Sequence, residues 1–354
     1  VLREKARRLD AVLLSFWISP DGSYLWVVTP GAITPFHLPP EKKITRLVDA
    51  WNTLVQRMED PRESADPVAR RLYDVLLGGA EQLIPPGSRV IVVPDGALHG
   101  LNLEALVTGD KHPHYWVEDV TVAVAPSLTL LDSRLSALEE KARGILLIGD
   151  PASSSADFPP LPESKTEIQN IRALFGPGDA TVITGAEARP EAYRPAEPGR
   201  FALIHFAAHA VANSESPLDS AVILSQGAQS SKLYARDAAA IPLHAELVTI
   251  SACRSAGAKM YAGEGLVGFS WAFLRAGARN VIAGLWDASD RATAGLMTRL
   301  YQEQRRGKNP AEALRAAKLA MLRGSAYRQP YYWAPFELFT RSAPFAPARV
   351  GASR

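Results

Sequence analysis

The stretch FALIHFAAHA, residues 201–210, combines an apolar run of strand length with a histidine that follows directly after it. Similar short apolar runs recur in the second half of the chain, at Gly144–Ile148, Ala180–Ile183, Leu247–Ser251 and Asn280–Leu285. Amphipathic helical patterns follow or separate them, at Glu264–Arg275, Arg291–Arg305 and Pro310–Leu322. Apolar strands that alternate with amphipathic helices are typical of a mostly parallel sheet with helices on both faces. We therefore predict an α/β fold for this half.

Two local patterns complete the second half. Ser164 and Glu167 have the spacing of a capping box, which predicts that a helix starts at Ser164. The run Phe336–Thr340 is expected to add a last strand at an edge of the sheet.

The first half of the chain has a different order of predicted strands and helices. The runs Ala11–Ser19 and Ser23–Pro30 flank Pro20-Asp21-Gly22, which predicts a β-hairpin. Helical patterns near Glu41–Met58 and Pro67–Ala80 precede a short buried strand. We therefore expect an N-terminal α+β subdomain over residues 1–142, an α/β subdomain over 143–342 and a tail over 343–354.

Composition narrows the function classes. The chain is 47% hydrophobic and 21% charged, and its formal net charge is +2, so nothing in the balance demands nucleic acid, a membrane surface or an acidic partner. No apolar run reaches the length of a membrane span, and the charged start is not that of a signal peptide. We therefore expect a cytoplasmic protein, and the start at Val1 predicts a fragment of a longer chain.

Cys253 is the single cysteine, which excludes an internal disulfide and a multi-cysteine metal site, and we expect neither metal nor cofactor. It lies two residues past the strand Leu247–Ser251, and His209 lies three past the strand Ala202–Phe206. Adjacent parallel strands would bring both to one edge of the sheet, where the imidazole can take the thiol proton. The sequence therefore predicts a Cys/His dyad, with the backbone N–H groups of Cys253 and Ala210 as the oxyanion hole. The competing interpretation is a small buried cysteine and a structural histidine.

The sequence also contains the glycine spacing of a dinucleotide-binding motif. Gly263, Gly265 and Gly268 spell G-x-G-x-x-G, and Asp287 follows 19 residues later (287 − 268). In that motif the first glycine directly follows a strand, whereas here a loop of small residues precedes it. We therefore interpret these glycines as a loop and close helix packing, and expect no nucleotide.

Several spaced motifs resemble the CHAT domain family. The resemblance rests on HFAAHAVANSESPLDSAVILS (205–225), LVTISACRSAGAKMYAGEGLVGFSWAFLRAGARNVIAGLW (247–286) and AEALRAAKLAML (311–322). Upstream, VVPDGALHGLNLEAL (92–106), VAVAPSLTLL (122–131), LLIGDP (146–151) and LPESKTEI (161–168) extend it over nearly the whole chain. This family comprises caspase-like proteins related to separase and to gingipain-type proteases.

The resemblance implies a caspase-hemoglobinase fold and a catalytic dyad of His209 and Cys253. It implies a thiol protease that cleaves a protein partner without a cofactor, in bacteria often within antiviral defence or cell-death systems. Gasdermin-like proteins are one substrate class, and an upstream tetratricopeptide region or activating partner is expected. One departure is Ala210, where the family usually has glycine; a positive φ would cost alanine more than glycine.

In this wider fold the specificity pocket lies among strand ends, where Asp150 and Asp287 occur. Paired carboxylates would select arginine or lysine at the cleaved position. The alternative is that Asp150 caps a loop; Asp290, close behind, is better interpreted as the cap of the helix from Arg291.

Two other functions stay open at this point. The first is a catalytically silent scaffold or sensor that works by protein–protein interaction. The second is a protease whose loop Arg254–Gly263 is held inactive until a partner binds to an upstream domain. The retained histidine and cysteine favour protease activity.

Overall fold

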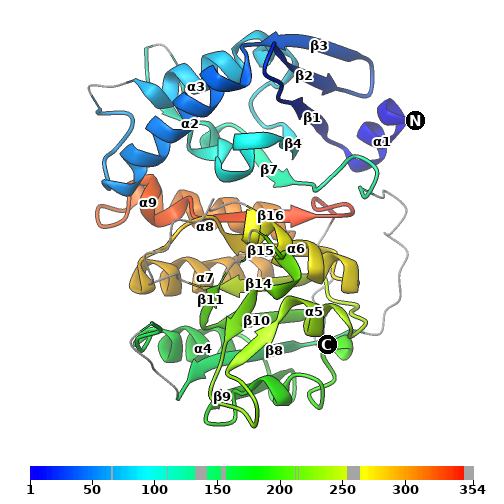
Figure 1. Ribbon diagram of the computed structural model, residues 1–354, viewed down its shortest axis with the longest axis vertical. Helices are drawn as coiled ribbons and strands as arrows, with labels where there is room; N and C mark the ends of the chain where they lie inside the picture. The colour runs from blue at the N-terminus through cyan, green and yellow to red at the C-terminus, as the bar shows by residue number, and fades with distance from the viewer. Residues whose placement is uncertain are drawn as a thin grey trace.

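A computed structural model describes residues 1–64, 67–109, 111–131, 142–152, 157–211, 213, 215–252 and 264–346. Within these residues eleven strands form one continuous sheet (Figure 1). In sheet order they are β3 (Ile33–Leu38), β2 (Ser23–Val28), β1 (Val12–Trp17), β4 (Arg89–Val93), β7 (Thr121–Val124), β16 (Phe336–Thr340), β15 (Asn280–Gly284), β14 (Leu247–Ser251), β10 (Leu203–Ala207), β8 (Ile145–Pro151) and β9 (Ala180–Gly185).

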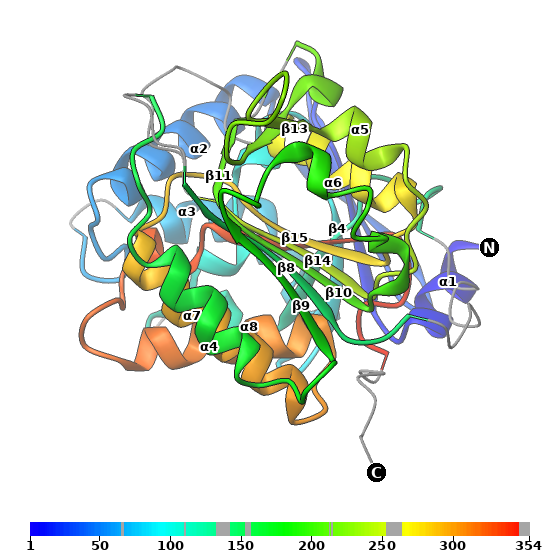
Figure 2. The ribbon, with the colours of Figure 1, turned by 90° about the horizontal axis from the view of Figure 1, so that it is seen from below.

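The second half forms the predicted α/β layers. Strands β9, β8, β10, β14 and β15 pair in parallel, and their central members are buried throughout. Figure 2 shows helices on both sides of these strands, with α4, α7 and α8 on one side and α5 and α6 on the other. The helices are α4 (Ser164–Arg172), α5 (Ala235–Ala239), α6 (Glu264–Ala276), α7 (Asp290–Arg305) and α8 (Pro310–Arg323). The predicted fold class is confirmed.

The first half contributes the other end of the sheet. Strands β1 and β2 form the predicted antiparallel hairpin, and β3, which the sequence did not indicate, pairs with β2 at the edge. The helices are α1 (Leu2–Leu9), α2 (Glu41–Gln56) and α3 (Val68–Leu76). Short elements complete this half: β5 (Val107–Thr108) and β6 (His114–Tyr115). None of the helices in the described part of the chain combines the length and apolar composition that a membrane crossing requires.

The strand β16 joins the two halves, so the prediction of an edge strand at Phe336–Thr340 was wrong. It pairs with β15 in antiparallel register, Ala283 opposite Glu337, and contacts β7 at Phe339 opposite Val124. All five of its residues are buried. The short helix α9 (Pro330–Trp333) leads into it, so the chain returns from α8 to the middle of the sheet.

A buried charged cluster lies beside this junction. Lys318 of α8 is fully buried, and its Nζ donates to Oε2 of Glu104, which is also buried. Burial raises the pKa of nearby Glu337 to about 8, with the Glu104 carboxylate adding to the rise and the Lys318 ammonium opposing it. The raised pKa favours the protonated form of Glu337 at neutral pH.

Candidate active site

His209 lies just past the end of β10, at the first position of β11 (His209–Val211). β11 forms a small antiparallel sheet with β12 (Ala221–Ile223) and β13 (Lys232–Tyr234). His209 is 4% exposed. Strands β10 and β14 are neighbours in register, Ala207 opposite Ser251, so His209 and Cys253 each follow a paired strand end by two residues. Cys253 itself lies outside the described residues.

A hydrogen bond to Pro159 places the ring hydrogen of His209 on Nε2. Nε2 lies 2.6 Å from the carbonyl oxygen of Pro159, and the Phe158 ring packs 5.8 Å from the imidazole. Because a carbonyl oxygen only accepts, Nε2 carries the hydrogen and donates it. In the neutral ring Nδ1 is then the basic nitrogen. The sequence did not indicate Pro159, because this residue acts through its backbone carbonyl oxygen and not through its side chain.

Asp290 holds the segment that carries Pro159. Its Oδ2 accepts a hydrogen bond of 2.8 Å from the backbone N–H of Glu163, and Oγ of Ser164 donates to the carbonyl oxygen of Leu161 at 2.7 Å. Burial raises the pKa of Asp290, while the Glu163 N–H and the charge of nearby His209 oppose the rise. The expected capping role was wrong: Ser289 is the N-cap of α7, and no side-chain cap bond forms there. The Asp290 carboxylate instead anchors the start of α4.

The capping box expected at Ser164 is also absent. Glu163 is the N-cap of α4, and the Glu167 carboxylate turns to the sheet, where Oε1 lies 2.7 Å from Nε2 of His205. Nδ1 of His205 lies 3.2 Å from the Tyr301 hydroxyl, which donates to Thr249. All four side chains are buried. A histidine inside the apolar run LIHF was the available signal, because a buried polar ring needs partners.

Ala210 lies within β11, opposite Val222 of β12. Its backbone is that of an extended strand residue, so the position does not require the positive φ that would favour glycine. The departure from the family pattern therefore carries no conformational cost here.

The two carboxylates expected at the specificity pocket occupy separate strand ends. Asp150 lies at a bulge near the end of β8 with φ of 48°, a left-handed conformation that aspartate tolerates better than most residues. Asp287 is partly buried on the connection from β15 to α7. Because β10 and β14 lie between β8 and β15, these strand ends are about 14 Å apart at normal strand spacing. The sheet does not place the two carboxylates side by side as a pair.

The glycines of the dinucleotide pattern fall on a helix. Gly265 and Gly268 lie within α6, which begins at Glu264, 13 residues after the end of β14 (264 − 251). Gly263 lies outside the described residues. The strand-to-helix turn that would hold a pyrophosphate is therefore not formed by these two glycines.

Comparison with solved structures places the fold in the caspase-like class. Two crystal structures of the Saccharomyces cerevisiae separase–securin complex match with TM-scores of 0.58 and 0.60 at 11% identity. The match covers 96% of this chain but only 30% of the separase chain, so the chain spans about a third of that protein. The Arg specific cysteine proteinase gingipain R matches with a TM-score of 0.50 at 13% identity, over 88% of this chain and 76% of that chain.

The sequence itself then identifies the family. The CHAT domain matches residues 66–341, so the chain belongs to the CHAT domain family. No curated protein sequence matches it.

Proposed function

We propose that this chain is a cysteine endopeptidase in which Nδ1 of His209 takes the proton of the Cys253 thiol. The hydrogen bond from Nε2 of His209 to Pro159 carries the proposal, because it leaves Nδ1 as the basic nitrogen. Ser251 ends the strand next to the one that precedes His209, which favours proximity of the two groups.

The chemistry follows from this arrangement. The thiolate attacks the scissile carbonyl carbon, and the backbone N–H groups of Ala210 and Cys253 stabilise the oxyanion. The imidazolium then protonates the leaving amine, and water hydrolyses the acyl-enzyme with the same imidazole as base. Every step uses groups of this chain, the substrate and water.

We further propose a basic residue at the cleaved position of a protein substrate. Gingipain R, an Arg specific proteinase, supports this by analogy of fold. Because Asp150 and Asp287 follow separated strands, one carboxylate acting alone would select the basic side chain. A gasdermin-like protein within a bacterial defence system is the proposed physiological substrate class.

A peptide panel tests the proposal. Wild-type protein and the Cys253→Ala variant are incubated with fluorogenic peptides ending in Arg, Lys, Asp or Leu, and with a candidate partner protein. We expect wild type alone to cleave, after Arg or Lys, with the site located by mass spectrometry. Equal cleavage by both proteins would contradict the thiol mechanism. Cleavage after Asp or Leu would contradict the basic preference alone.

Asp290 provides a test of the positioning of Pro159. We expect Asp290→Ala to lower kcat about tenfold with little change in KM, because losing the anchor at Glu163 lets the Pro159 carbonyl move away from His209. Asp290→Asn keeps an acceptor for the Glu163 N–H and should stay close to wild type. Steady-state kinetics of the three proteins measure this. Equal loss in both variants would show that the charge, and not the acceptor, matters.

A further inference from the structure

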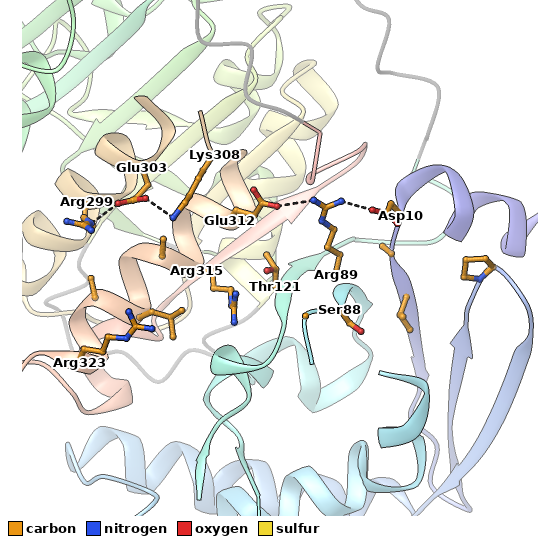
Figure 3. Close-up of a pocket in the computed structure, with 17 residues that line it drawn as sticks. Asp10, Ser88, Arg89, Thr121, Arg299, Glu303, Lys308, Glu312, Arg315 and Arg323 are labelled. Carbon is orange, nitrogen blue, oxygen red and sulfur yellow. Dashed lines mark hydrogen bonds and ion pairs between the residues drawn. The ribbon is translucent and has the colours of Figure 1, made fainter. Parts of the chain in front are cut away.

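A cavity of about 900 Å³ lies away from His209, against the α7–α8 hairpin and the first residues of β1, β4 and β7 (Figure 3). Five cationic side chains line it: Arg89, Arg299, Lys308, Arg315 and Arg323. The acidic side chains in its wall are Asp10, Glu303 and Glu312. The distribution of these charges, and not only their number, indicates what the cavity binds.

The charge is unbalanced at the end of α7. Glu303 is paired at once with Arg299 at 3.0 Å, Arg306 at 2.6 Å and Lys308 at 2.7 Å, as Figure 3 shows for Arg299 and Lys308. These cations lower the pKa of Glu303, led by the hydrogen bond from Lys308. Three cations on one carboxylate leave a formal surplus of two positive charges.

Two more guanidinium groups extend this surplus along α8. Arg315 donates through Nε to the carbonyl oxygen of Val117 at 2.7 Å and through Nη2 to that of Glu118 at 2.5 Å, so neutral groups hold it in place. Burial lowers the pKa of Arg315, the charges of Glu104, Asp119 and Glu118 oppose the fall, and the positive charge of neighbouring Arg323 adds to it. Arg323 is exposed and has no carboxylate partner in the part of the chain that the structure describes.

The opposite wall carries no such surplus, since its charged lining residues are Arg89 and Asp10. Arg89 pairs with Asp10 at 2.6 Å and also reaches Glu312, in the first turn of α8, at 3.1 Å. The positive surplus is therefore confined to the α7–α8 side, where cations repel one another in the absence of an anion. A multivalent anion seated there would relieve this repulsion.

We propose that this cavity binds a small molecule carrying more than one phosphate group. Guanidinium forks match phosphate oxygens in bidentate geometry, and Arg315 keeps donors beyond the two used for Val117 and Glu118. The volume is that of an ordinary small-molecule pocket. This site stands apart from the proposed peptidase function, since none of its residues was assigned to catalysis.

Isothermal titration at matched ionic strength tests the site with inorganic tripolyphosphate and ATP, and with citrate as a carboxylate comparator. We expect saturable binding of tripolyphosphate, weakened about tenfold by Arg323→Gln, with citrate much weaker. Arg200→Gln, on an exposed side chain of another region, is the control for loss of one positive charge and should leave binding unchanged. Because Arg323 is exposed, its variant should keep the wild-type melting temperature without ligand.

Three results would overturn the proposal. The first is no saturable binding of either phosphate compound by wild type. The second is equal affinity of wild type and Arg323→Gln, or equal weakening by Arg200→Gln, which would indicate non-specific charge attraction. The third is tighter binding of citrate than of tripolyphosphate, which would assign the cavity to carboxylates. Binding is read directly, so these outcomes do not depend on peptidase activity.

Discussion

Replacing His209 by glutamine is expected to lower kcat/KM for peptide cleavage by about 10³-fold, within the range of about 10²–10⁴ that a general base contributes. Nε2 of His209 donates to Pro159, so in the proposed mechanism the proton transfer falls to Nδ1. A glutamine amide can still donate to the same carbonyl oxygen, but its own oxygen is not basic enough to take a thiol proton. The loss should therefore appear in kcat, with folding intact.

His244→Gln is the matched control, because His244 is exposed and precedes β14. Steady-state kinetics should show wild-type activity for this variant, and denaturant unfolding should place both variants within about 1 kcal/mol of wild type. A His209→Gln protein that keeps more than about a tenth of the activity would remove His209 from the role of base.

The buried strands were predictable because their composition is local information. The runs that became β8, β10, β14 and β15 are mainly apolar, as is typical of strands covered on both faces. Strand order is not local. The run FELFT was expected at an edge of the sheet, but the fold places it between β7 and β15, buries Glu337 and raises its pKa to about 8. Burial in the middle of the sheet favours the neutral form of this carboxyl group.

The candidate site was predictable only where side chains at strand ends carry it. His209 follows a strand, and the parallel-sheet rule therefore selects it. Pro159 acts through a carbonyl oxygen, which every residue has, so no residue type marks it. The sequence patterns assigned Asp290 and Glu167 to helix capping. In the fold the Asp290 carboxylate instead accepts from the backbone N–H of Glu163, and the Glu167 carboxylate contacts His205. Short-range patterns cannot rank a local cap against a partner that lies far along the chain.

The second large effect concerns the junction between the halves of the sheet. Lys318 of α8 and Glu104 of the first half form an ion pair from which water is excluded, since both side chains are buried. Burying two charges is costly in itself, so the pair is weak evidence for stability. Removing one partner is nevertheless strongly destabilising, because the remaining charge is buried without an opposite charge beside it.

We expect Lys318→Met to lower the free energy of unfolding by about 3–5 kcal/mol, because Glu104 is left buried and unpaired beside Glu337. Methionine keeps most of the volume, so a cavity contributes little. Urea denaturation measures the change, and Lys165→Met, on the exposed face of α4, should stay within about 0.5 kcal/mol of wild type. Adding Glu104→Gln removes the uncompensated charge and should restore part of the loss. A single variant that loses less than about 1 kcal/mol, or a double variant less stable than the single one, would show that this pair does not hold the junction together.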